Sequence, residues 1–341
     1  MNIFFKPIHF VSLFLSLLFT CHIHAQPPGQ GGLPQRTISE LGDGLYQVNT
    51  GPGVAAVFVF LVTEAGILIV DPPNPATAEW LQEQLVSRFP EQEVVFVVES
   101  HYHWDHTRGA SAFASTATFI GHENMPENMD ASIAEAPPPG NTRDEDGDGL
   151  LSRTEAQTGT LANFDAMDSN GDNFLTQSEL TMGVVRPDIV FSDRLELNLG
   201  GKRVVLLWAQ NRHTNDLIDV YFPDHGVLLA NDYVWINRVC CNFSFDERPL
   251  TTWIESIRSL EALDFNILIN SHFASGTKQD LIAFRRWLED LAFVVSAGIS
   301  EGKTLEEIQA TNELQQYSNW AAYENQLDSI IASAYNSLML E

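Results

Sequence analysis

The sequence predicts an α/β fold in which two mixed β-sheets lie between layers of helices. Two observations predict it: apolar runs of strand length recur through the chain, and segments with apolar residues at helical spacing lie between and after them. Hydrophobic residues make up 44% of the 341 residues, an ordinary share for a globular protein, so the composition argues against a disordered chain.

The charge and the cysteine content exclude several classes of function. The chain has 45 Asp and Glu against 18 Lys and Arg, a formal net charge of −27. Sequence-independent binding of nucleic acid needs clustered Lys and Arg, as does a basic helix on a membrane surface, so neither is expected here. Three Cys in this length cannot form a disulfide scaffold or a four-thiolate zinc site.

The first element, residues 1–25, is predicted to be a cleaved secretory signal. Lys6 gives a short basic start, residues 10–21 are an apolar run too short to span a bilayer comfortably, and the segment ends on Ala25. An uncleaved N-terminal anchor is the alternative. With cleavage, the mature chain begins near Gln26 and is periplasmic or secreted, and no later stretch predicts stable membrane insertion.

The strands and helices of the sandwich follow a leader rich in Pro, Gly and Gln. Wholly apolar runs such as 66–70 and 94–98 have the length and composition of buried strands. We expect strands at 44–48, 54–62, 66–70, 94–98, 194–199, 203–208, 217–222, 227–230 and 267–269. Apolar residues at helical spacing predict helices at 76–89, 251–263, 278–297 and 314–338.

An acidic insertion is predicted at 122–186, and it divides the sandwich domain into residues 26–121 and 187–341. The segment holds thirteen acidic and three basic residues, and a Pro-Pro-Pro-Gly run at 137–140 breaks the rhythm of strands. This change in composition predicts an insertion into the sandwich.

Two 12-residue segments of the insertion, 144–155 and 168–179, resemble the calcium loop of the EF-hand. A hard cation such as Ca²⁺ takes many oxygen ligands, which both loops offer at the same positions. The predicted ligands are Asp144, Asp146, Asp148, Leu150, Ser152 and Glu155 in the first loop and Asp168, Asn170, Asp172, Phe174, Thr176 and Glu179 in the second. The turn glycine of the first loop is Gly149, and Asn173 holds the equivalent position in the second loop. Asn is a tolerable replacement there, because it enters the left-handed region more easily than most residues. The resemblance of the loops to the EF-hand implies that the insertion is small and α-helical. Leu151 and Leu175 are expected to pair the loops. An acidic, solvated loop without calcium is the alternative.

A His-rich turn directly after the predicted strand 94–98 indicates a transition-metal site. His101, His103, Asp105 and His106 place four ligand-type side chains within six positions. Imidazole and carboxylate ligands together suit zinc and its neighbours in the transition series. The turn is therefore the best candidate for the chemistry of this protein.

The sequence His-Tyr-His-Trp-Asp-His of this turn resembles the His-x-His-x-Asp-His motif of the metallo-β-lactamase superfamily. Further residues of that family are matched in order along the chain, namely by Asp71, His213, Asp232 and His272. The resemblance implies the αββα sandwich of the family and a dinuclear metal centre. One metal would be held by His101, His103 and His213 and the other by Asp105, His106 and His272, with Asp232 bridging them.

The resemblance also implies a hydrolase with two Zn²⁺, or with iron or manganese in the same ligands, and the predicted signal makes it an exported one. Two metals that share a water lower its pKa to roughly 7, so a metal-bound hydroxide would attack an ester, thioester, lactone or related carbonyl, with Asp105 orienting the nucleophile. Asp232 favours a glyoxalase-II-like or lactonase-like ligand set, because zinc β-lactamases have Cys or Ser at that position. The alternatives are a periplasmic β-lactamase, a calcium-binding scaffold without hydrolytic activity, and an iron-containing redox protein.

Other reactive side chains are expected to be structural. His122 and His225 have no place in the implied ligand set. The adjacent Cys240 and Cys241 are expected to be part-buried, with a strained vicinal disulfide as the alternative. The expected partner is a small-molecule substrate, and the sequence predicts no particular oligomeric state.

Overall fold

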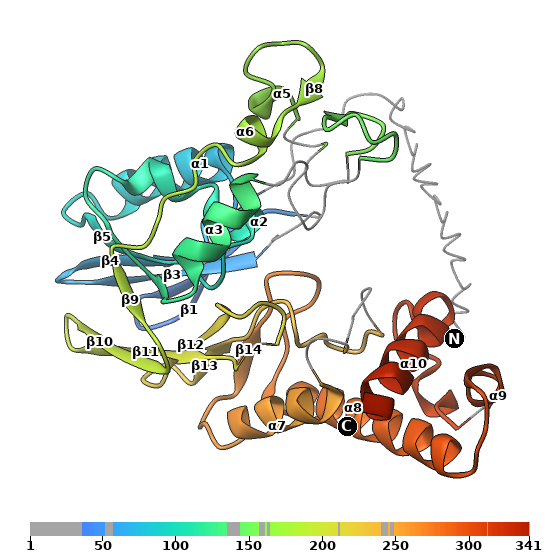
Figure 1. Ribbon diagram of the computed structural model, residues 1–341. Helices are drawn as coiled ribbons and strands as arrows, with labels where there is room; N and C mark the ends of the chain where they lie inside the picture. Colours follow the sequence, from blue (N-terminus) through green and yellow to red (C-terminus); the bar gives the residue numbers. More distant parts are fainter. Residues whose placement is uncertain are drawn as a thin grey trace, which may run out of the picture. The chain divides into compact units, whose positions relative to one another are not determined.

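Two β-sheets form the centre of the computed structural model (Figure 1). The structure describes residues 36–51, 57–134, 144–156, 161, 164–210, 212–239, 245, 249–311 and 313–340. The larger sheet has seven strands in the order β1-β2-β3-β4-β5-β6-β9, and the smaller has five in the order β10-β11-β12-β13-β14. With the helices on their outer faces, these sheets make the mixed α/β sandwich that the sequence predicts.

The seven-stranded sheet changes from antiparallel to parallel pairing along its width. Its strands are β1 (Thr37–Gly42), β2 (Leu45–Asn49), β3 (Val57–Thr63), β4 (Gly66–Val70), β5 (Val94–Val98), β6 (Thr118–His122) and β9 (Ile189–Phe191). Strands β1 to β4 pair antiparallel, whereas β4, β5, β6 and β9 pair parallel. The carboxyl ends of β4 and β5 therefore lie side by side, so the residues that follow them meet at one edge of the sheet.

The five-stranded sheet positions the predicted metal ligands of the later sequence, because they lie in loops next to its strands. Its strands are β10 (Arg194–Leu199), β11 (Lys202–Trp208), β12 (Ile218–Phe222), β13 (Val227–Leu229) and β14 (Ile267–Ile269). The parallel pair β13 and β14 ends just before Asp232 and His272, and His213 lies in the loop that leads into β12. The strands expected at these positions are confirmed, whereas β1, β6 and β9 were not anticipated.

The core between the two sheets arises from strands that are apolar on both faces. In β4, Leu68 and Val70 belong to the cluster between the sheets, whereas Ile67 and Ile69 face the outer helices, as the two-residue period of a strand requires. All four side chains are fully buried. Full burial of such a side chain stabilises the fold by about 1.5–3 kcal/mol, which explains why this strand has no polar face.

One helix layer covers the outer face of the seven-stranded sheet. It contains α1 (Pro75–Arg88), α2 (Trp104–Thr107), the 3₁₀ turn η1 (Ala110–Phe113) and α3 (Met125–Ala134). Helix α1 begins where the Asn74 side chain accepts a hydrogen bond from the Thr77 N–H at 2.9 Å, with Pro75 in the first turn. Its buried residues Leu81 and Leu85 pack on the sheet.

The second helix layer packs on the five-stranded sheet through a core rich in Trp and Leu. It contains α7 (Leu250–Leu260), α8 (Lys278–Ser300), α9 (Leu305–Gln309), η2 (Gln315–Tyr317) and α10 (Tyr323–Leu340). The helix predicted at 314–338 is corrected, because its first residues form η2 and Ala322 has a φ of +61°, which ends one helical segment before α10 starts. Within the described residues, no helix has both the length and the apolar character needed to cross a membrane.

The acidic segment folds around a small apolar cluster. It contains β7 (Leu151–Ser152), β8 (Phe174–Leu175), α5 (Phe164–Met167) and α6 (Gln177–Leu180). Leu151 pairs with Leu175 in the antiparallel β7–β8 ladder, as the two repeated loops predict. Leu151, Phe164, Met167, Leu175 and Leu180 bury one another in this cluster. The predicted signal at 1–25, the Pro run at 137–140, Cys240 and Cys241 lie outside the described residues.

Candidate metal centre

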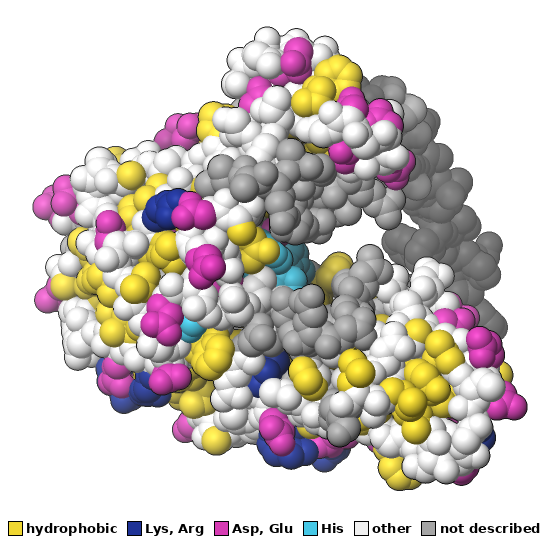
Figure 2. All heavy atoms as spheres, viewed as in Figure 1, with side chains coloured by type: hydrophobic (Ala, Val, Ile, Leu, Met, Phe, Trp, Pro, Cys, Tyr) yellow, Lys and Arg dark blue, Asp and Glu magenta, His cyan; other side chains and the backbone are white. Residues whose placement is uncertain are grey.

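The seven predicted metal ligands converge where loops from both sheets meet. His101 and His103 follow β5, Asp105 and His106 lie on α2, and the remaining three come from the loops before β12 and after β13 and β14. Figure 2 shows histidine side chains reaching the surface on this face of the molecule. Residues separated by long stretches of sequence are thus brought to one site by the sheet topology.

The first group consists of three imidazoles and one carboxylate. Ligand atoms of His101, His103, His213 and Asp232 all lie within 4.8 Å of one another. The Nε2 atoms of His101 and His213 are 3.4 Å and 3.5 Å from Asp232 Oδ2. His213 Nε2 is 3.0 Å from His103 Nδ1, so these two ring nitrogens face each other within the first group.

The second group lies next to the same carboxylate. Asp105, His106 and His272 also place their ligand atoms within 4.8 Å of one another. His106 Nε2 is 3.3 Å from Asp232 Oδ2, and His272 Nε2 is 3.0 Å from Asp232 Oδ1. Asp232 therefore faces both groups, which is the position of a bridging ligand.

The chemistry of these donors fits two divalent cations. The Nε2 atoms of His101 and His106 are buried and have no hydrogen-bond partner among the described residues. Buried polar atoms normally have a partner, and a bound cation would supply one to several of these nitrogens at once. His101 and His106 are fully buried, whereas the side chains of His213 and His272 are 28% and 16% exposed, so the site opens to solvent on their side.

Burial sets the protonation of the first group. It lowers the pKa of His103 to about 4 and holds the pKa values of His101 and His213 well below the ordinary value, with neighbouring imidazoles adding to the effect. Burial alone would also lower the pKa of His106, but Asp232, Asp105 and Asp71 raise it well above its ordinary value. Neutral imidazole is the metal-binding form, so the first group is ready to bind at neutral pH.

Asp71 makes hydrogen bonds to residues in and around the site. Its Oδ2 accepts hydrogen bonds from Ser100 Oγ at 2.6 Å and from Asn231 Nδ2 at 2.7 Å, and it lies 3.0 Å from His106 Nδ1. Asp71 and Asp232 have φ values of +52° and +62°, in the left-handed region that non-glycine residues seldom adopt. This conformation at two strand ends is local strain of the kind that concentrates at functional sites.

Two buried carboxylates behind the ligand loops were missed by sequence reasoning. Asp216 Oδ2 accepts a hydrogen bond from the N–H of Tyr102, between His101 and His103, at 2.9 Å, and burial raises its pKa to about 6. Both carboxylate oxygens of Asp219 accept the hydroxyl of Tyr233 at 2.8 Å. Asp219 interrupts an apolar strand, and this interruption was the available signal.

An arginine lies at the edge of the site. The guanidinium of Arg238 is 3.9 Å above the ring of Phe273, the residue that follows His272. Phe273 is 50% exposed and has a φ of +64°. Within the described part of the chain, Arg238 has no carboxylate within ion-pair distance, so its charge is available to an anionic group near the metal ligands.

The two predicted calcium loops have matching backbone geometry. In the first, Asp144 accepts hydrogen bonds from the N–H groups of Gly147, Asp148 and Gly149, and in the second Asp168 accepts them from Gly171, Asp172 and Asn173. Asn173 has a φ of +69°, which confirms the left-handed turn. Oxygens of Asp144, Asp146 and Glu155 lie within 4.8 Å of one another, whereas the described second loop has no such carboxylate trio.

The remaining predicted loop residues hold the closing turn of each loop. Glu155 accepts hydrogen bonds from Ser152, and Glu179 accepts them from Thr176 and Ser169. Asp148 and Asp172 accept the N–H groups of Leu150 and Phe174. Asn170 donates to Asp172 at 3.0 Å. The side chains predicted to bind calcium therefore hydrogen-bond within their own loops.

The histidines expected to be structural lie outside the metal groups. His122 Nε2 is 2.7 Å from the Ser192 carbonyl, and its ring stacks on Trp208. His225 Nε2 is 3.2 Å from the Asp43 carbonyl.

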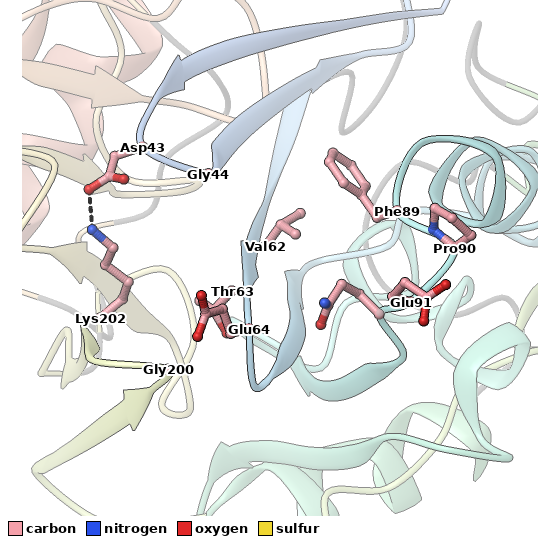
Figure 3. Close-up of a pocket in the computed structure, with 11 residues that line it drawn as sticks. Asp43, Gly44, Val62, Thr63, Glu64, Phe89, Pro90, Glu91, Gly200 and Lys202 are labelled. Carbon is pink, nitrogen blue, oxygen red and sulfur yellow. Dashed lines mark hydrogen bonds and ion pairs between the residues drawn. The ribbon is translucent and has the colours of Figure 1, made fainter.

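A cavity of about 510 Å³ at the opposite ends of the strands is lined by Thr63, Phe89 and Lys202 (Figure 3). Its Lys202 is paired with Asp43, and it shares no residue with the metal centre.

Comparisons with known proteins agree on the fold. The model of the Metallo-beta-lactamase superfamily matches residues 51–272. The alpha subunit of 2,4-dinitroanisole O-demethylase from Nocardioides sp. (strain JS1661) is 23% identical over 280 residues, which is 78% of this chain and 68% of that protein. A solved stereoselective inverting sec-alkylsulfatase from Pseudomonas sp. is 16% identical with a TM-score of 0.60, over 88% of this chain and 50% of that one. This chain thus spans about half the length of the alkylsulfatase. A metallo-beta-lactamase from Pontibacter korlensis is 15% identical with a TM-score of 0.51, over 75% of this chain and 100% of that one.

Proposed function

The chain belongs to the Metallo-beta-lactamase superfamily, and from this membership we propose that it is a dinuclear zinc hydrolase for ester, thioester, lactone or related carbonyl substrates. The family and the converging ligands make it a metal-dependent hydrolase or a related enzyme. The observation that carries the finer proposal is the position of Asp232, whose two carboxylate oxygens face both ligand groups at 3.0–3.5 Å.

The proposed ligand sets follow the two groups. His101, His103 and His213 would hold one ion and Asp105, His106 and His272 the other, with Asp232 shared. When bound, two such ions would lower the pKa of a coordinated water to roughly 7 and would polarise a carbonyl oxygen. Asp105 Oδ2, 3.5 Å from His272 Nε2, is placed to accept a proton and to orient the attacking water.

The residues at the open side favour particular substrates. His213 and His272 are more exposed than His101 and His106, so substrate would reach the centre from their side. The guanidinium of Arg238 beside Phe273, which has no carboxylate partner among the described residues, suits a substrate with an anionic group, such as a carboxylate or a sulfate ester. Sulfate esters and activated aryl ethers belong in the first screen, since the similar proteins are named as an alkylsulfatase and an O-demethylase.

We also propose that the loops 144–155 and 168–179 bind two Ca²⁺. Their support is the duplicated ligand pattern together with the equivalent turns at Gly149 and Asn173 and the β7–β8 pairing. Export through a signal at 1–25 fits calcium loops of this kind, because extracellular calcium is abundant. Mass spectrometry of the intact protein from the periplasm and the cytoplasm of a bacterial host tests the export proposal: a chain in the periplasm that begins near Gln26 supports it, and a chain that keeps Met1 and stays in the cytoplasm contradicts it.

Metal content and a substrate panel together test the proposed function. The full chain is purified without chelator, and its metals are counted by elemental mass spectrometry before and after a calcium-free wash. About two zinc ions per chain, with hydrolysis of at least one lactone, thioester or ester, support the proposal. Iron or manganese in place of zinc would correct the metal that the proposal names. Hydrolysis of β-lactams alone would correct its substrate class. A chain that holds only calcium would contradict the proposed hydrolase function.

A further inference from the structure

Arg108 is buried between the metal-ligand helix and the acidic insertion. Helix α2 contains the metal ligands Asp105 and His106, and Arg108 is its C-terminal cap residue. Arg108 is only 2% exposed, and its guanidinium lies 4.3 Å above the ring of Trp104, the first residue of the same helix. Arg108 therefore lies at the end of the turn that contains the two ligands, and its side chain packs on the residue at the beginning of that turn.

The same guanidinium contacts both ends of the second predicted calcium loop. Arg108 donates from one terminal nitrogen to the Leu180 carbonyl at 3.2 Å and to Met167 Sδ at 3.0 Å. Met167 directly precedes the loop 168–179, and Leu180 directly follows it. One side chain thus joins the metal-ligand turn to the beginning and the end of this loop.

Backbone contacts fix the same interface. Ser111 N–H donates to the Gly183 carbonyl at 3.0 Å, three residues beyond Leu180. Gly183 has a φ of +95°, and a Cβ there would lie 2.0 Å from the Arg108 carbonyl oxygen. Only glycine permits this close approach. Together with the Ser111–Gly183 hydrogen bond, it holds the insertion against the α2 turn.

A purely structural role does not account well for a charge in this place. Among the described residues Arg108 has no carboxylate within ion-pair distance, and its Nε has no hydrogen-bond partner. Burial of an incompletely paired guanidinium is costly, and an apolar side chain would fill the space at lower cost. The directional hydrogen bonds to the loop ends are what an arginine adds.

We propose that Arg108 is a positioning residue that couples the order of the 168–179 loop to the Asp105–His106 side of the metal centre. An ordered loop holds the Leu180 carbonyl and Met167 in place, Arg108 then fixes the α2 turn, and the ion held by Asp105, His106 and His272 binds more tightly. The inference rests on the two-ion centre proposed above, and it assigns the insertion a role in metal retention.

The test compares Arg108→Met and Arg108→Lys with the unaltered chain. Each protein is dialysed against graded concentrations of a zinc chelator, and the ions retained are counted by elemental mass spectrometry. We expect Arg108→Met to keep the first ion and to bind the second roughly 10- to 100-fold more weakly, the range for removal of groups that orient ligands. Arg108→Lys should recover part of this loss, since it keeps the charge without the planar fork.

Three further proteins keep the outcome clear. Arg203→Met removes an arginine on β11 that pairs with Asp224, and should leave both ions bound. Gly183→Ala disturbs the interface without changing the Arg108 side chain, and should weaken the second ion even if Arg108→Met fails to fold. Met167→Leu removes only the sulfur contact and should have a smaller effect.

The outcomes separate this inference from the proposed function. An unaltered chain that holds fewer than two transition-metal ions contradicts the two-ion centre itself. If the unaltered chain holds two ions and folded Arg108→Met holds them equally well, the coupling is overturned. Equal loss of both ions in Arg108→Met and Gly183→Ala also overturns it, because that pattern reports general damage to the fold.

Calcium provides a second readout that does not depend on activity. Coupling between sites is reciprocal, so added Ca²⁺ should tighten the second transition-metal ion of the unaltered chain by roughly 5- to 150-fold. In Arg108→Met this effect of Ca²⁺ should be absent. Cobalt(II) titration followed by visible absorption measures the second ion directly, and an equal response to Ca²⁺ in both proteins contradicts the proposed link.

Discussion

Asp71 Oδ2 lies 3.0 Å from His106 Nδ1, although the two residues are 35 positions apart in the sequence. The carboxylate can accept a hydrogen bond from this nitrogen, which leaves Nε2, 3.3 Å from Asp232 Oδ2, as the nitrogen of neutral His106 that would face a metal. Ser100 and Asn231 hold the same carboxylate in place. Asp71 thus selects the tautomer and the direction of a proposed metal ligand without being one.

Asp71→Asn should weaken metal binding while leaving the set of ligands complete. The amide cannot accept all four hydrogen bonds of the carboxylate and can present an N–H toward His106. We expect the affinity for the ion held by His106 to fall roughly 10- to 100-fold, measured by competition with a colorimetric zinc chelator. Asp224→Asn, at a distant turn where Asp224 pairs with Arg203, is the matched control. Unchanged zinc affinity in Asp71→Asn would show that its hydrogen bonds are dispensable.

Removal of one histidine from each group should remove one ion rather than both. His213→Ala deletes a ligand of the first group and His272→Ala a ligand of the second, and each should retain about one transition-metal ion per chain. Elemental mass spectrometry after gel filtration counts the ions. His225→Gln changes a histidine whose ring lies near the Asp43 carbonyl, away from both groups, and should retain two. Loss of both ions from each alanine variant would favour a single cooperative site.

Much of the fold could be predicted because burial leaves a clear pattern in the sequence. Strands β4 and β5 are wholly apolar, and the structure buries them in the middle of a sheet. Strand β9 was missed because its apolar run is only three residues long, and its pairing with β6 is what defines it as a strand. Edge strands of this kind depend on a partner that local sequence does not reveal.

The candidate metal ligands could be predicted for a different reason, since four of them are crowded into one turn. The residues that support them could not, because each is a single polar side chain whose partner is distant. Arg108 contacts a residue 72 positions away, and Tyr102 contacts one 114 positions away. Only the three-dimensional arrangement shows that Asp216 and Asp219 are buried behind the ligand loops.

Calcium should stabilise the insertion through the last residue of each loop. Glu179 accepts hydrogen bonds from Thr176 and Ser169, which lower its pKa to about 2 although partial burial opposes them, so it is ionised and ready for a cation at neutral pH. Glu179→Gln and Glu155→Gln should each lose about one Ca²⁺ and the corresponding rise of the melting temperature in millimolar Ca²⁺. Calorimetry with and without Ca²⁺ measures the rise. Glu196→Gln, on the exposed strand β10, is the control, and an undiminished rise in both loop variants would contradict calcium binding at Glu155 and Glu179.

Asp219 should make the stability of the protein depend on pH. Burial raises its pKa from 3.8 to about 7, although the Tyr233 hydroxyl and Arg212 oppose this rise. The native state then holds a proton that the unfolded chain releases, so the free energy of unfolding contributed by this group is full below about pH 4 and falls as the pH rises toward 7.

Asp219→Asn removes this titration and keeps an acceptor for the Tyr233 hydroxyl. Relative to the unaltered chain, the variant should gain stability between pH 5 and pH 8, by up to roughly 4 kcal/mol at about 1.4 kcal/mol per pKa unit. Urea unfolding of the metal-saturated proteins at several pH values measures the difference. Tyr233→Phe is the informative partner, because it keeps the carboxyl and removes a hydrogen bond that favours the ionised form. Its loss of stability should therefore extend to higher pH. Parallel curves for Asp219→Asn and the unaltered chain would mean that Asp219 is ionised throughout, with Arg212 and Tyr233 outweighing burial.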